Sequence, residues 1–92
     1  DLIKKANEMI EDGRYSEAYD SLIKHQDDLR TANTIGVSLM MQKKFEEAMP
    51  WLKKAAEGGC EAAQENIAAI NAEYEYEAKQ ARIIEEYLKT LE

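Results

Sequence analysis

Apolar residues in the first 57 positions recur with helical spacing, in four segments separated by short polar or glycine-containing turns. Leu2, Ala6, Met9 and Ile10 share one face of a helix that Asp12–Gly13 ends. The same spacing predicts three further helices, from about Ser16 to Ile23, from Leu29 to about Gln42, and from about Lys44 to Glu57. Four such helices joined by short turns are expected to pack as antiparallel hairpins.

The ends of the predicted helices carry recognisable signals. Asp27–Asp28 offers an N-cap and first-turn carboxylates to the third helix. Gly58–Gly59 is typical of a left-handed C-terminal cap for the fourth. Pro50 falls inside the fourth helix, where we expect a local kink or a late helix start.

The second hairpin repeats the first at a distance of thirty residues, since "GRYSEAYDSL" at 13–22 matches "KKFEEAMPWL" at 43–52. Ala18 and Ala48 occupy equivalent positions, and Ala6 and Gly36 do so on the facing helix. Gly36 in mid-helix costs up to about 1 kcal/mol relative to Ala, so close approach of the partner helix is its expected role. Lys43 stands where the first copy has Gly13, which implies a conformational cost if its φ is positive.

The stretch 60–92 contains neither Gly nor Pro and is predicted to form a single helix of about 33 residues. Its apolar positions alternate in steps of three and four, with a polar residue at Glu77 and a small one at Ala81. We call this row the seam: Ile67, Ile70, Tyr74, Glu77, Ala81, Ile84, Leu88 and Leu91.

The first half of the seam is expected to cover the second hairpin, as terminal units of helical arrays require. The second half extends beyond the hairpins and leaves an apolar stripe uncovered: Ile83, Ile84, Tyr87, Leu88 and Leu91. Self-association, packing on another part of a parent protein, and a frayed end all remain open for it. Contact with another chain or copy, such as a homodimer through this helix, is favoured.

Composition and charge narrow the fold and the function classes. One Pro, four Gly and few β-branched residues favour an all-α fold. The net charge of −7 gives no basic stripe for nucleic acid and disfavours an anionic membrane surface. No apolar run approaches the ~20 residues that span a bilayer, so no membrane insertion is expected.

Candidate chemistry is sparse. His25 is the only histidine, and we interpret it as a helix-terminal residue. Cys60, the only cysteine, reads as a small residue at a helix start. Without a nucleophile, base and orienting group in one cluster, we predict no enzyme, no catalytic residue, no metal ligand and no cofactor.

"IGVSLMMQKKFEEAMPWLKKA" resembles a tetratricopeptide repeat through Gly36, Leu39, Phe45, Ala48, Leu52 and Ala55. "LIKKANEMIEDGRYSEAYDSLIKH" resembles a second copy, and "WLKKAAEGGCEAAQENIAAI" is similar to the related Sel1-like variant. The resemblance implies an α-α superhelix in one domain, with repeat one at about 1–28, repeat two at about 29–59 and a long capping helix at about 60–92. The spacing of thirty is shorter than the family's thirty-four, so a shortened segment is expected around His25–Asp28.

The resemblance also implies a function: non-catalytic binding of a protein or peptide in a concave groove lined by the first helix of each pair. Carried over by position, the groove residues are Asn7, Ile10, Arg30, Asn33, Val37 and Met40. The family's pocket for a C-terminal carboxylate is not expected, because Asn7 alone fits its pattern while Ile3 and Thr34 occupy partner positions.

The alternative function is structural: a scaffold segment of a larger protein that packs or dimerises through the long helix. The start at Asp1–Leu2 leads us to expect a piece excised from such a protein. Modules of this type resemble those appended to larger bacterial proteins, so by fold-level analogy a bacterial parent is expected, with cytoplasm and cell envelope both open.

Overall fold

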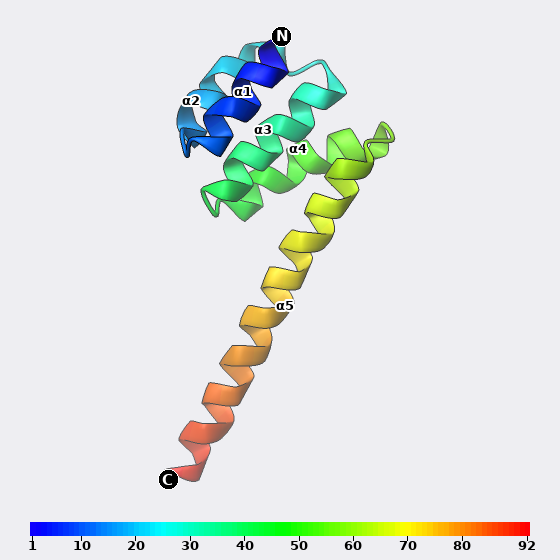
Figure 1. Cartoon of the computed structure of the whole chain (residues 1–92). Coiled ribbons are helices and arrows are strands. Elements are labelled where there is room, and N and C mark those ends of the chain that lie inside the picture. The colour runs from blue at the N-terminus through cyan, green and yellow to red at the C-terminus, as the bar shows by residue number, and fades with distance from the viewer.

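The computed structural model describes residues 1–92 and consists of helices without strands, which confirms the all-α prediction. Figure 1 shows the short helices gathered at one end and one long helix projecting away from them. We call the four-helix part the head. The elements are α1 (Leu2–Glu11), α2 (Tyr15–Leu22), the 3₁₀ turn η1 (Ile23–His25), α3 (Leu29–Met41), α4 (Phe45–Glu57) and α5 (Glu61–Thr90).

The turns after α1, α3 and α4 are built in one way. Each places a residue with positive φ just past the helix: Gly13 at 79°, Lys43 at 63° and Gly59 at 95°. In each turn that residue and the next donate backbone N–H groups to the last turn of the helix, as in the pair Lys43 to Met40 and Lys44 to Leu39. Lys43 alone adopts this conformation with a side chain, so the predicted conformational cost is present.

The small residues that match between the hairpins lie at the helix contacts. Ala6, Ala18 and Ala48 are fully buried. A Cβ placed on Gly36 would lie 2.5 Å from Cδ2 of Leu52, so a larger residue fits only if the buried Leu52 side chain shifts. The predicted close packing of α3 on α4 is confirmed. The three alanines belong to a core that also contains Leu22, Ala32, Ile35, Leu39, Leu52, Ala55, Ala63 and Ile70.

The segment between the hairpins is short, as expected. α2 has 8 residues and passes into η1 instead of continuing. Asp28 then caps α3, because its side chain accepts a hydrogen bond from the backbone N–H of Arg30. The predicted N-cap is therefore correct.

The late helix start expected from Pro50 is wrong. α4 begins at Phe45 and continues through Pro50 to Glu57. Pro50 and Glu46 are both exposed, so water can reach the Glu46 carbonyl that has lost its amide donor. The loss of one hydrogen bond on the solvent side is small beside the packing of Ala48 and Leu52 on the opposite side.

α5 has a covered part and an uncovered part. Ala63, Ile67 and Ile70 pack on the core, whereas every residue from 71 onward is exposed. The helix is continuous over 30 residues, slightly shorter than predicted. No helix of the protein combines the length and the apolar character needed to cross a bilayer.

Candidate functional site

The residues predicted to line a groove lie on two neighbouring helices, α1 and α3, which contact each other. Asn7 and Arg30 are exposed. Ile10 and Met40 are half-buried and pack against the core, so only part of each is accessible to a partner. Asn33 and Val37, which come between Arg30 and Met40 in the sequence of α3, are half-buried.

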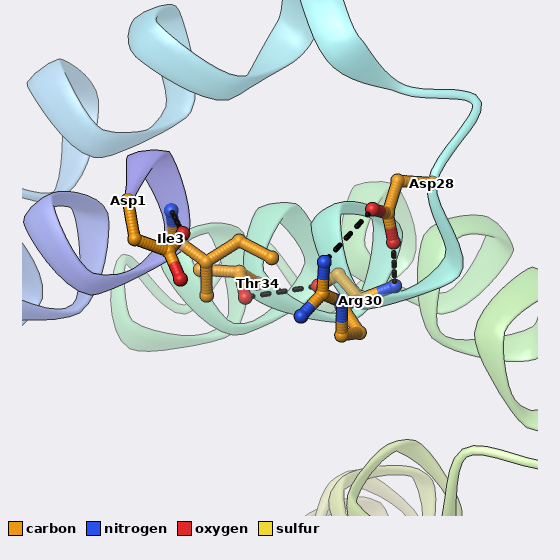
Figure 2. A network of polar contacts seen from close by, with 5 residues as sticks. All are labelled: Asp1, Ile3, Asp28, Arg30 and Thr34. Carbon is orange, nitrogen blue, oxygen red and sulfur yellow. Dashed lines mark hydrogen bonds and ion pairs between the residues drawn. The ribbon is translucent and has the colours of Figure 1, made fainter.

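Arg30 is held by its own helix start. Figure 2 shows its guanidinium directed at Asp28, at 3.3 Å from Oδ2, while the Arg30 backbone N–H donates to Oδ1 at 2.8 Å. These hydrogen bonds, the guanidinium first, hold the pKa of Asp28 below its usual value. The carbonyl of Arg30 accepts from the Thr34 hydroxyl at 3.0 Å. The cation is therefore partly neutralised before any partner arrives.

A shallow hollow of about 360 Å³ lies next to Arg30. It contains the predicted helix-terminal His25, together with Lys24, Asp27 and Asp28. Cations and carboxylates both line it, so it offers no single charge to a ligand.

Asn66 joins α5 to the predicted groove. Its Nδ2 donates to Oδ1 of Asn33 at 3.3 Å, which ties the second full turn of α5 to the side of α3. Asn66 was not among the predicted residues. The available signal was its place in the sequence, a polar residue beside Ile67 at the point where the seam meets the head.

The stripe holds five of the nine large apolar side chains that are exposed in the chain. Its side chains remain 51% exposed at Ile83, 58% at Ile84, 62% at Tyr87, 56% at Leu88 and 65% at Leu91. All five belong to the part of α5 that no other element covers. Large apolar side chains gathered on one surface usually mark a contact with another molecule.

A second hollow, of about 450 Å³, lies where α5 leaves the head. Its lining comes from the α3–α4 turn, the start of α4 and the middle of α5: Lys43, Lys44, Phe45, Glu46, Glu47, Tyr74 and Glu77. Phe45 and Tyr74 meet edge to face with ring centroids 6.0 Å apart. The sequence placed Tyr74 and Glu77 in the seam but gave no sign of this hollow, because the hollow depends on the angle at which α5 leaves the head.

One ion pair lies outside these surfaces. Arg14 hydrogen-bonds Glu17 one turn into α2. This contact raises the pKa of Arg14 and lowers that of Glu17. Both side chains are more than half exposed, so we assign the pair to the helix surface.

Candidate chemistry stays dispersed. His25 lies in η1, and Cys60 is the half-buried N-cap residue of α5. No three His, Cys, Asp or Glu side chains come together in a way that could hold a metal ion.

Comparison with protein-family models, with curated proteins and with solved structures finds no match. The surfaces of the chain are therefore interpreted from their own geometry.

Proposed function

We propose that this chain is a non-catalytic protein-interaction module, similar to a tetratricopeptide or Sel1-like repeat, and that it binds through the stripe of α5. The observation that carries the proposal is the exposure of five large apolar side chains on an uncovered helix. Full burial of a large apolar side chain is favourable by roughly 1.5–3 kcal/mol relative to its exposure to water. A protein surface that covers them recovers part of this free energy.

Site-specific photocrosslinking tests this function. A photoreactive amino acid replaces Ile83 or Tyr87 in the stripe and, as matched controls, Arg82 or Glu86 on the other side of the same turns. The proposal predicts protein adducts from the stripe positions, identified by mass spectrometry, and few from the controls. Equal yields from both sides, or no adduct, would remove it.

The α1–α3 surface is a second candidate, favoured by one contact. The Asn33–Asn66 hydrogen bond sets α5 beside α3, as α3 lies beside α1. In a tetratricopeptide array the first helices of successive pairs line the concave surface in this order. A partner bound there would be lost on replacing Asn33 and Val37, whereas a partner of the stripe would be lost on Ile84→Asp.

A further inference from the structure

We propose that the partner of the stripe is a second copy of this chain, and that the two α5 helices pair antiparallel over Tyr74–Leu91. The inference rests on the proposed function, since it names the partner of the same surface. It follows from the order of residues in the seam, from the position of the head, and from the hollow at the base of α5.

The order of seam residues fits an antiparallel pair. The two helices run in opposite directions, so the seam of one meets the seam of the other in reverse order. In the proposed register, Ala81 faces Ile84 of the second copy, Glu77 faces Leu88, and Tyr74 faces Leu91. The first of these contacts matches a small residue with a large one, and Glu77 meets an apolar side chain instead of another carboxylate. A parallel pair in register would place Glu77 against Glu77 and Ala81 against Ala81, giving like charges in one layer and a void in the next.

The position of the head favours the same orientation. Ile67 and Ile70, the first two residues of the seam, already pack on the head. In a parallel pair both heads would lie at one end of the helices, on the side where the seams meet. In an antiparallel pair they lie at opposite ends, and only the uncovered halves overlap. Figure 1 shows this uncovered half extending clear of the head.

The hollow at the base of α5 gives the second helix a place to end. In the proposed register, Leu88 and Leu91 of the second copy lie against Glu77 and Tyr74, which line the hollow together with Phe45. The C-terminus of a helix carries partial negative charge. Lys43 and Lys44 line the hollow, so in the proposed dimer their positive charges lie near the C-terminal end of the second copy's α5 and its Glu92. Glu46 and Glu47 line the hollow as well.

The two-fold axis doubles each contact. The stripe of each copy lies against Tyr74–Ala81 and the hollow of the other copy, and the two equal contacts form together, so the interface is isologous and closes without a free binding surface. The overlap of Tyr74–Leu91 measures about 27 Å at 1.5 Å per residue. Such a short helix pair needs the added contacts with the head to reach the roughly 800 Å² per partner of a stable interface.

Sedimentation equilibrium of the 92-residue chain at micromolar concentrations tests association. We expect twice the chain mass of 10.5 kDa. Ile84→Asp and Leu88→Asp should raise the dissociation constant at least tenfold, because in the proposed register the new carboxylates face Ala81 and Glu77 of the second copy. Ala72→Asp, an exposed position away from the seam, is the matched control and should stay dimeric. A monomer throughout, a higher oligomer, or a dimer indifferent to both seam variants would overturn the proposal.

Disulfide trapping tests the orientation, in a Cys60→Ser background. Mixing the Tyr74→Cys chain with the Leu91→Cys chain should give a covalent dimer, while Leu91→Cys alone should not. In the antiparallel pair the two Leu91 positions lie about 25 Å apart. Ready crosslinking of Leu91→Cys alone would show a parallel pair and overturn the proposal. A stripe that photocrosslinks only to a different protein would also overturn it, while leaving the proposed function standing.

Discussion

Lys43 has a left-handed backbone conformation at φ 63°, whereas its counterpart Gly13 has φ 79° without a side chain. A residue with a side chain pays about 1–2 kcal/mol to adopt this conformation. Glycine avoids that cost, but its unfolded chain is more flexible, which offsets part of the advantage. Lys43→Gly should therefore stabilise the protein by up to about 1 kcal/mol, measured by urea unfolding. Gly13→Ala is the reciprocal variant and should destabilise. If both changes act in the same direction, the two turns are not equivalent.

Gly36 is the residue on which the contact of α3 with α4 depends. A methyl group there would lie 2.5 Å from Leu52, which is fully buried and has little room to move. Overpacking of this kind costs about 1–3 kcal/mol, more than the helix propensity of about 1 kcal/mol that alanine adds. We expect Gly36→Ala to lower the free energy of unfolding by about 1 kcal/mol, as the difference of these two effects.

Gly58→Ala is the matched control for this variant. A methyl group there would also collide with a leucine side chain, Leu29, but that side chain is 38% exposed and can rotate away. The expected change is within about 0.5 kcal/mol. An equal loss at both sites would mean that burial of the neighbouring leucine does not decide the outcome.

The residues that were predictable from the sequence are those whose side chains are limited by near neighbours. Ala18, Ala48 and Gly36 stand at matched offsets, and only small residues fit between closely packed helices. Asn66 could not be recognised in the same way, because its contact with Asn33 spans 33 residues of sequence. Arg30 was predicted in the groove, but its hydrogen bond to Asp28 emerged only from the structure.

At the scale of elements, the N-cap of α3 makes stability depend on pH. The Arg30 hydrogen bonds lower the pKa of Asp28 in the folded protein. The stabilisation is therefore complete above the unfolded value of about 3.9 and is lost as pH falls through the folded value. Asp28→Ala should lower the urea midpoint at neutral pH, and this deficit should shrink below about pH 4. Asp27→Ala, which removes a neighbouring carboxylate that does not cap, should show neither effect.

α5 should behave as two segments with different energetic weight. Ile70 is 1% exposed, so Ile70→Ala should cost about 2–5 kcal/mol of unfolding free energy. Ile84 is 58% exposed, so Ile84→Ala should change the stability of the monomer by at most about 0.5 kcal/mol. Urea unfolding at a protein concentration too low for the chains to associate measures both variants as monomers and compares their stabilities. A large effect at Ile84 in the monomer would show that the stripe already packs on the head.

Helix ends were predictable to within a few residues because their signals are local. Gly13, Asp28 and Gly59 end or begin helices through their own backbone or side-chain chemistry. The late start that was one of the two outcomes expected from Pro50 does not occur, because the effect of a proline depends on which side of α4 it lies. The continuity of α5 followed from the absence of Gly and Pro, and the structure adds where its covered half ends.

At the scale of the whole molecule, the sequence predicted the number of helices but not the angle at which α5 leaves the head. The hollow beside Phe45 and Tyr74 combines residues about thirty positions apart and exists only because α5 leaves the head at one particular angle. Hydrophobic periodicity records which side of a helix is covered, and it carries no information about that angle. The groove residues stay a prediction, while the stripe follows from exposure in the structure itself.

The overall shape gives a test of the proposed dimer that needs no substitution. A single chain is elongated, with a longest extent of 59 Å and a radius of gyration of 16.4 Å. An antiparallel pair that overlaps by about 27 Å would be roughly 90 Å long, because the two heads lie at opposite ends. A parallel pair would remain near the length of one chain. Small-angle X-ray scattering across a dilution series should therefore show the maximum dimension falling from roughly 90 Å toward that of one chain as the dimer dissociates. A maximum dimension close to that of one chain at every concentration would rule out the antiparallel arrangement.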